Sequence, residues 1–130
     1  MILQFRPTLY LSDEKLDLKK LQEKGITAVV VVSDDLDCPK CPADSEVQVH
    51  KIGLRANRIN SPYIKDLVCH LVKTLLQNGE AVVVLASDPL NRGAFVVCRV
   101  VCEIENKILT DVIRELKMLE EDLKPQYVYY

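Results

Sequence analysis

The fold is decided by residues 81–93, which read AVVVLASDPLNRG. The first five residues are apolar and mostly β-branched, without the alternation of a half-exposed strand, so they predict a strand covered on both faces. Ala28–Val32 is a second run of this kind. Because buried parallel strands need helices on both sides, the two runs predict a parallel sheet between helical layers.

Weaker signals complete the sheet and supply the helices. Val47 to Leu54 predicts a third strand, and Leu9 to Leu11 predicts a short early one. Four helices are expected: one capped by Ser12-Asp13 and ended by Gly25, one from Ser61-Pro62 to Asn78-Gly79, one from about Gly93 to Glu105, and one from Thr110-Asp111 to Pro125. The predicted fold class is α/β, with a central, mostly parallel sheet that is mixed at one edge and has helices on both faces.

The composition limits the possible classes of function. The 130 residues suit a single domain (1–130) with a sizeable core, although the chain can also be cut from a longer protein. The 17 Lys and Arg residues against 19 Asp and Glu residues leave a charge of -2, which argues against a nucleic-acid-binding protein. No apolar run reaches the roughly 20 residues of a membrane helix, so membrane insertion is not expected. Five cysteines without a secretory signal indicate reduced thiols and a cytoplasmic or nuclear location.

The loop at residues 86–92 leaves the carboxyl end of the predicted strand and enters a helix. Ligands of open α/β sheets bind at this edge. A helix N-terminus there offers unpaired N–H groups and a positive dipole, and Arg92 adds a guanidinium suited to phosphate. Position alone therefore predicts a phosphate-binding loop, made of Ala86, Ser87, Asp88, Pro89, Leu90, Asn91 and Arg92.

The loop and its surroundings resemble the dual-specificity (cysteine-based) protein phosphatases. The signature of that family is His-Cys, five residues, then Arg and Ser or Thr, between a buried strand and a helix. Arg92 matches the arginine of this signature. Four further stretches resemble the family in order along nearly the whole chain: LYL (9–11), with Ser12 in place of the next glycine, GITAVV (25–30), LRAN (54–57) and AFVV (94–97). The resemblance implies the fold of these phosphatases.

The resemblance also implies that the chemistry of the family is lost. Its mechanism needs a thiolate that attacks phosphorus, and Ala86 stands at the position of that cysteine. Leu85 replaces the preceding histidine, and Ser87 is one residue away from the nucleophile position and has no apparent base. We expect no enzyme activity and no catalytic residue at the degenerate positions, which are Ala86, Arg92, Gly93 (in place of Ser or Thr) and Arg58 (in place of the general-acid aspartate).

Phosphate binding without turnover is a separate question. Pro89 has no N–H group to offer to an anion. Asp88 places a carboxylate in the loop, where it repels a bound anion and can pair with Arg92. We therefore expect weak or absent phosphate affinity, with Arg92 acting as a structural residue.

The favoured function is that of a pseudophosphatase, an inactive phosphatase-like domain that binds or scaffolds another protein. Arg55 and Arg58, with Lys51, form a small basic cluster that could attract an acidic or phosphorylated partner, although a solvated surface is the simpler explanation. Two alternatives stay open: a phospho-residue reader that uses the degenerate loop, and a trapping mutant of an active phosphatase with Ala86 in place of cysteine. No cofactor is expected, and the sequence leaves the partner and the oligomeric state open.

The remaining chemistry-bearing residues have simpler explanations. Cys38 and Cys41 form a lone C-x-x-C in a polar loop, where zinc would need two more ligands, so no metal site is expected. Buried thiols that pack as small hydrophobic groups are expected within helices, at Cys69, Cys98 and Cys102. Three tyrosines crowd into residues 127–130, and such aromatic ends dock onto the body of a protein or bind a partner.

Overall fold

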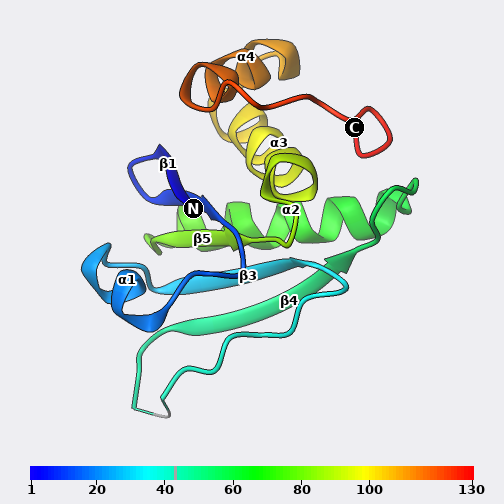
Figure 1. The fold of residues 1–130 in the computed structure, drawn as a ribbon. Coiled ribbons are helices and arrows are strands. Elements are labelled where there is room, and N and C mark those ends of the chain that lie inside the picture. The colour runs from blue at the N-terminus through cyan, green and yellow to red at the C-terminus, as the bar shows by residue number, and fades with distance from the viewer. Residues whose placement is uncertain (43) are drawn as a thin grey trace.

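A five-stranded sheet forms the centre of the molecule (Figure 1). The computed structural model describes residues 1–42 and 44–130. The strand order is β1-β2-β5-β3-β4, with β1 (Ile2–Arg6), β2 (Leu9–Ser12), β3 (Ala28–Ser33), β4 (Gln48–Leu54) and β5 (Val82–Leu85). Strands β2, β5, β3 and β4 run parallel, and the edge strand β1 is antiparallel to β2. The predicted α/β fold, with a parallel sheet that is mixed at one edge, is confirmed.

Helices cover both faces of the sheet, as the continuous apolar strands predict. Val82 and Val84 of β5 point into the larger core, which they share with α2 (Pro62–Gln77), α3 (Ala94–Glu105) and α4 (Leu109–Leu119). Val83 and Leu85 point to the opposite face, where they pack with Leu21 of α1 (Leu18–Glu23). A π-helical turn, η1 (Pro89–Gly93), joins the end of β5 to α3.

One helix begins as predicted and another does not. At α2, the Ser61 hydroxyl accepts the Ile64 N–H at 3.2 Å, and Pro62 takes the first helical position. The predicted cap of α1 at Ser12-Asp13 is wrong, because Ser12 is the last residue of β2 and its hydroxyl donates to the Met1 carbonyl at 2.7 Å. Asp17 caps α1 instead, by accepting the Lys20 N–H.

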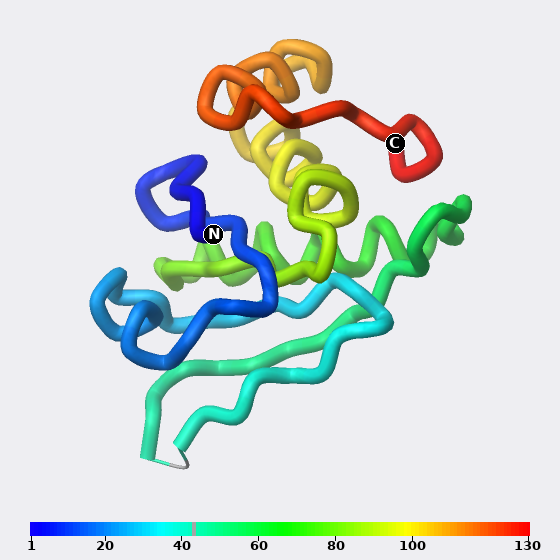
Figure 2. Tube along the Cα trace, viewed as in Figure 1, coloured from blue at the N-terminus to red at the C-terminus, as the bar shows by residue number. Residues whose placement is uncertain are grey.

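The end of the last helix is also earlier than predicted. Helix α4 stops at Leu119, because Glu120 already has extended backbone angles, and the six residues up to Pro125 leave the helix. The chain then returns across the start of α3 (red in Figure 2), with Leu123 and Tyr129 fully buried in the larger core. Within residues 1–42 and 44–130, no helix combines the length and the apolar character needed to cross a membrane.

Strand β1 has no counterpart among the predicted elements. Gln4 and Arg6 interrupt its apolar residues, and the strand ends directly before Pro7. It folds back onto β2, and Arg6 fixes it to the helical layer by donating to Glu105 at 2.6 Å and to Glu115 at 3.0 Å. Tertiary pairing rather than local pattern therefore places this edge strand.

Candidate functional site

The loop after β5 lies where three parallel strands end side by side. Ser12 of β2, Leu85 of β5 and Val31 of β3 are paired at one level of the sheet. The segments that follow these strands therefore meet at the carboxyl edge. Residues 86–92 form the predicted crook between strand and helix, with a short loop followed by the turn η1.

The Arg92 guanidinium is enclosed in this crook, with 2% of its side chain exposed. Its acceptors come from three segments of the chain. Nε donates to Asp88 Oδ1 at 2.8 Å. Nη1 donates to Leu54 O at 2.8 Å and to Asp34 Oδ1 at 3.1 Å, and Nη2 donates to Ser87 Oγ at 2.9 Å and to Asp35 Oδ1 at 3.2 Å. A guanidinium has five N–H donors. Every donor of Arg92 is therefore used by the chain itself, and its expected pairing with Asp88 is one of these bonds.

The charge around Arg92 is negative on balance, because three carboxylates surround one guanidinium. Burial alone would lower the pKa of Arg92, but the hydrogen bond and charge of Asp88 and the charge of Asp35 raise it above its usual value. Burial alone would raise the pKa of Asp35, but the hydrogen bond from Ser87 and the charge of Arg92 lower it. Both directions favour the charged forms of Arg92 and Asp35.

Backbone amides of the loop are also occupied. Three of them donate within the protein: Ala86 N to Ser12 O (3.0 Å), Ser87 N to Ser33 Oγ (3.1 Å) and Asn91 N to Asp88 O (2.9 Å). Pro89 has no amide hydrogen. Since a phosphate cradle needs several converging N–H groups, these three bonds and the proline reduce what the loop could offer to an anion.

Ser87 does have a carboxylate partner, so the expectation that no base lies near it is wrong. Its hydroxyl lies 3.0 Å from Asp35 Oδ1 and 3.2 Å from Oδ2. Asp35 follows β3 and reaches Ser87 across the sheet edge, a proximity that the linear sequence does not contain. The lowered pKa of Asp35 makes it a weak base for a hydroxyl proton.

The position of the family's cysteine is closed to solvent. Ala86 is 0% exposed and belongs to the larger core. A Cβ atom on Gly93 would lie 2.5 Å from Cδ1 of Leu11 and 3.5 Å from Cβ of Ala86. A serine or threonine at position 93 would therefore need the Leu11 side chain to move.

Asp34 and Asp35 are site residues that sequence reasoning missed, since residues 33–45 were interpreted as a plain polar loop. Asp34 fits against β4 because of Gly53, where an added Cβ would come within 2.7 Å of the Asp34 Cα. The Asp34 amide donates to the Leu54 carbonyl at 3.1 Å, which fixes the turn after β3. Two carboxylates directly after a buried parallel strand are the sequence signal that could have found them.

Arg55 and Arg58, the predicted partner surface, lie on the loop between β4 and α2 and are exposed. The same loop carries Asn57, whose amide donates to the Tyr129 hydroxyl at 2.8 Å. Tyr130 packs its ring edge-on against Phe95 at 5.4 Å. The aromatic C-terminal residues therefore dock onto the body beside this loop, one of the two outcomes expected for them.

The cysteines form no metal centre in the part of the chain that the structure describes, where no group of three ligating side chains comes together. Cys38 is exposed, and Cys41 is partly exposed. Cys69 and Cys98 are buried as predicted, and burial raises the pKa of each thiol to about 12. Cys102 is only partly buried, which corrects its prediction as a core residue.

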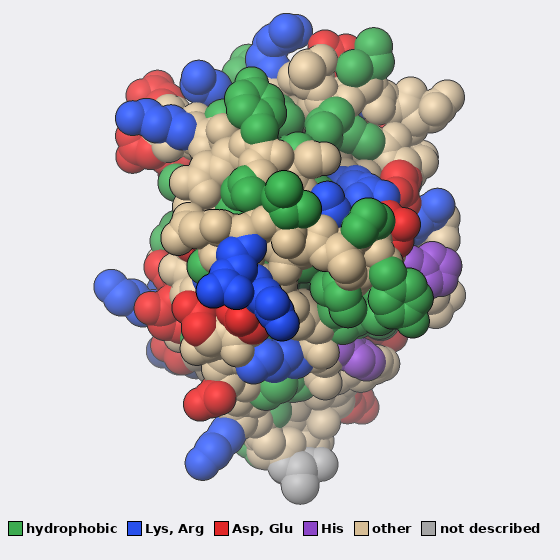
Figure 3. Space-filling view, turned by 90° about the vertical axis from the view of Figure 1, so that its right-hand side faces the viewer, with side chains coloured by type: hydrophobic (Ala, Val, Ile, Leu, Met, Phe, Trp, Pro, Cys, Tyr) green, Lys and Arg blue, Asp and Glu red, His purple; other side chains and the backbone are tan. Residues whose placement is uncertain are grey.

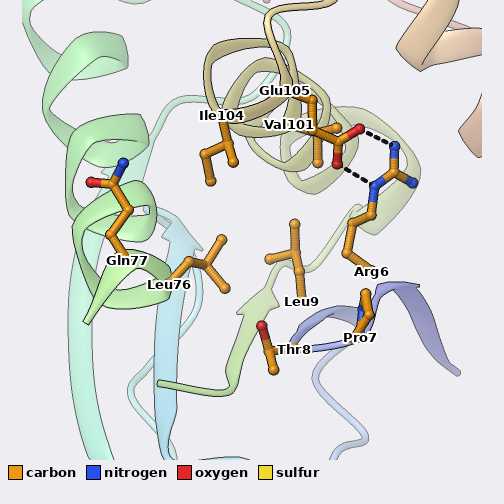
Figure 4. Close-up of a pocket in the computed structure, with 9 residues that line it drawn as sticks. All are labelled: Arg6, Pro7, Thr8, Leu9, Leu76, Gln77, Val101, Ile104 and Glu105. Carbon is orange, nitrogen blue, oxygen red and sulfur yellow. Dashed lines mark hydrogen bonds and ion pairs between the residues drawn. The ribbon is translucent and has the colours of Figure 1, made fainter. Parts of the chain in front are cut away.

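A separate hollow of about 340 Å³ lies away from the loop, between the β1–β2 turn and the ends of α2 and α3 (Figure 4). Leu9, Leu76, Val101 and Ile104 give it apolar walls. At its rim, the Arg6 guanidinium is paired with Glu105. The hollow brings together no group of the phosphatase signature.

Structural comparison places the fold in a known class. Human DUSP28 superposes with a TM-score of 0.83 at 17% identity, over 98% of this chain and 86% of that one. A mouse putative dual specificity phosphatase, solved with zinc tungstate, gives 0.85 at 16% identity over 98% and 80%. The human tyrosine phosphatase-like serine/threonine/tyrosine-interacting protein gives 0.79 at 16% identity over 98% and 89%.

The chain therefore has the dual-specificity phosphatase fold, as its sequence resemblance implies. At these identities the likeness concerns the fold alone. By sequence, no protein-family model and no curated protein matches the chain.

Proposed function

We propose that this protein is a phosphatase-like domain without phosphatase activity, which serves as a protein-interaction module. The observation that carries the proposal is the state of the loop at residues 86–92. The methyl group of Ala86 stands where the family's mechanism needs a thiolate. All five N–H donors of Arg92 form hydrogen bonds within its own chain.

Electrostatics supports the loss of phosphate binding as well. A phosphate dianion would approach a loop edge that already holds the carboxylates of Asp34, Asp35 and Asp88 around one guanidinium. Repulsion between the phosphate and these carboxylates opposes binding, and the positive dipole of the helix N-terminus offsets it only weakly. A phospho-residue reader would need hydrogen-bond donors for the phosphate, and Arg92 has none free.

The interaction role is supported by what the fold retains. The sheet, the helices and the loop geometry persist without the reactive groups, so the surface is free of the constraints that catalysis imposes. One structural neighbour is named as an interacting protein. The partner that we propose is another protein, recognised through an exposed face rather than through phosphate.

Hydrolysis of a generic aryl phosphate tests the loss of activity. We expect the wild-type chain and Ala86→Cys to give no more turnover than buffer, since the new thiol would be buried and would lack a histidine before it. Circular dichroism serves as the control that the variant is folded. Turnover by the wild type overturns the proposal, and turnover by Ala86→Cys alone identifies a trapping mutant instead.

Calorimetric titration with a phosphotyrosine peptide and its unphosphorylated form tests the reader alternative. The proposal expects no difference between the two peptides. Micromolar affinity for the phosphorylated form alone would establish a reader and overturn the assignment.

A further inference from the structure

Three large apolar side chains are exposed near the start of α2. Ile59 is 82% exposed, Tyr63 73% and Leu67 40%. Tyr63 and Leu67 lie one turn apart on the same helix face, and Ile59 lies two residues before the Ser61 cap. Apolar side chains that gather in this way on a soluble domain mark contact surfaces more often than scattered ones do.

A hollow of about 510 Å³ runs alongside Tyr63 and Leu67, between α2 and α3. It is lined by Tyr63, Asp66, Leu67, His70, Arg99 and Glu103. The face on which α2 begins is turned toward the viewer in Figure 3, where hydrophobic side chains lie beside histidine and basic ones. The hollow is large enough to receive an apolar side chain of a partner.

Charges inside the hollow are already paired, whereas two on the loop before α2 are not. Arg99 pairs with Asp66 and, at 3.6 Å, with Glu103. Arg55 and Arg58 are exposed, and the described residues offer neither of them an ion pair within 4 Å. The unbalanced positive charge of this loop complements a partner that carries carboxylates.

The loop that presents Ile59 is held in place by its own polar groups. The Asn60 side chain is 6% exposed, accepts the Arg55 N–H at 2.7 Å and donates to the carbonyls of Arg55 and Arg58 at 3.1 and 3.3 Å. The Tyr129 hydroxyl accepts the Asn57 N–H. A loop that is ordered before binding loses little entropy when a partner docks.

We propose that Ile59, Tyr63 and Leu67, with Arg55 and Arg58, form the docking surface for a partner-protein segment that combines apolar and acidic residues. The inference rests on the proposed function, since it locates the interaction of an inactive module. An aliphatic or aromatic side chain of the segment enters the hollow between α2 and α3. Its carboxylates lie against Arg55 and Arg58.

The test selects random 12-residue peptides displayed on phage against the wild-type chain and measures the chosen peptides by fluorescence anisotropy. The expected peptides carry an aliphatic or aromatic residue flanked by aspartate or glutamate. Ile59→Ser and Arg58→Glu should each weaken binding at least about tenfold. Matched controls are Ile108→Ser and Arg114→Glu, at similarly exposed positions on or next to α4, and these should change affinity less than about twofold.

The outcomes distinguish a failure of the proposed docking surface from a failure of the proposed function. Peptides without an acidic excess, or peptides that bind Ile59→Ser as well as wild type, overturn the docking surface and leave the inactive module intact. Failure to select any peptide also overturns it. Aryl phosphate turnover, by contrast, removes the proposed function whatever the peptides show.

Discussion

Arg92 is held by acceptors from three segments of the chain: the loop after β5, the turn after β3 and the end of β4. In an active phosphatase such an arginine must keep donors for its substrate, but here the carboxylates of Asp34, Asp35 and Asp88 take three of them. We propose that this arrangement makes Arg92 a structural residue rather than a ligand-binding one. Removing the carboxylates should therefore reverse part of the change.

We predict that the double variant Asp35→Ala with Asp88→Ala gains affinity for phosphate. The two substitutions release one donor each from Nε and Nη2 of Arg92 and remove two negative charges. Calorimetry should detect a Kd in about the millimolar range. Asp66→Ala, which removes the surface partner of Arg99, is the control and should bind no phosphate. A double variant as inert as the wild type would contradict the role given to these carboxylates.

Gly53 yields a second residue-scale prediction. A Cβ atom there would approach the Asp34 backbone to 2.7 Å, so Gly53→Ala should push the turn after β3 away from Arg92. We expect a loss of about 2–4 kcal/mol in urea unfolding, from strain and from the weakened ion pair. At Gly79, which has φ +84 but no atom within 4 Å of an added Cβ, alanine should cost about 1–2 kcal/mol. Equal losses at the two positions would show that the contact with Asp34 is unimportant.

Sequence reasoning found one part of this cluster and missed the rest for a physical reason. Asp88 and Arg92 are four residues apart, so their pairing follows from local spacing. Asp34 and Asp35 are more than 50 residues away from Arg92, and only the parallel pairing of β3 with β5 brings them close. The same limit explains the error about Ser87, whose carboxylate partner comes from the neighbouring strand end.

Among the elements, the strands and helices with continuous or periodic apolar patterns were predictable, and those fixed by pairing were not. Buried strands β3 and β5 and the capped start of α2 carry their own signals. The edge strand β1 is short and antiparallel to β2, and its residue Arg6 makes ion pairs with α3 and α4 that the sequence pattern does not reveal. The contact between β1 and the helices should therefore depend on charge.

We predict that this contact fails in acid. The hydrogen bond from Arg6 lowers the pKa of Glu105 to about 2, from 4.5. A carboxylate with a lowered pKa stabilises the fold above pH 4.5, and this contribution disappears as the pH falls toward 2. Glu105→Gln should cost about 1–2 kcal/mol at neutral pH and nothing at pH near 2, as measured by urea unfolding.

The control for the acid prediction is Glu121→Gln, on the exposed residue after α4, which should match the wild type at every pH. If Glu105→Gln instead loses the same free energy at both ends of the pH range, the ion pair with Arg6 is not the source of the acid sensitivity.

On the scale of the whole molecule, the C-terminal residues tie the helical layer to the loop between β4 and α2. Tyr129 is 1% exposed and accepts the Asn57 N–H at 2.8 Å, whereas Tyr127 is 85% exposed. Tyr129→Phe should cost about 1–2 kcal/mol, the loss expected for one buried hydrogen bond, and should speed amide hydrogen exchange at Asn57. Tyr127→Phe should change neither quantity. Unchanged exchange at Asn57 in Tyr129→Phe would show that the loop is held by other contacts.

We propose that residues 86–92 bind no oxyanion, because all five hydrogen-bond donors of Arg92 are used by its own chain. Titration of the wild-type chain with tungstate, followed by calorimetry, tests this claim most directly. The account predicts no saturable heat up to about 10 mM tungstate. Stoichiometric binding below about 1 mM that disappears in Arg92→Lys, with the variant still folded, would contradict it.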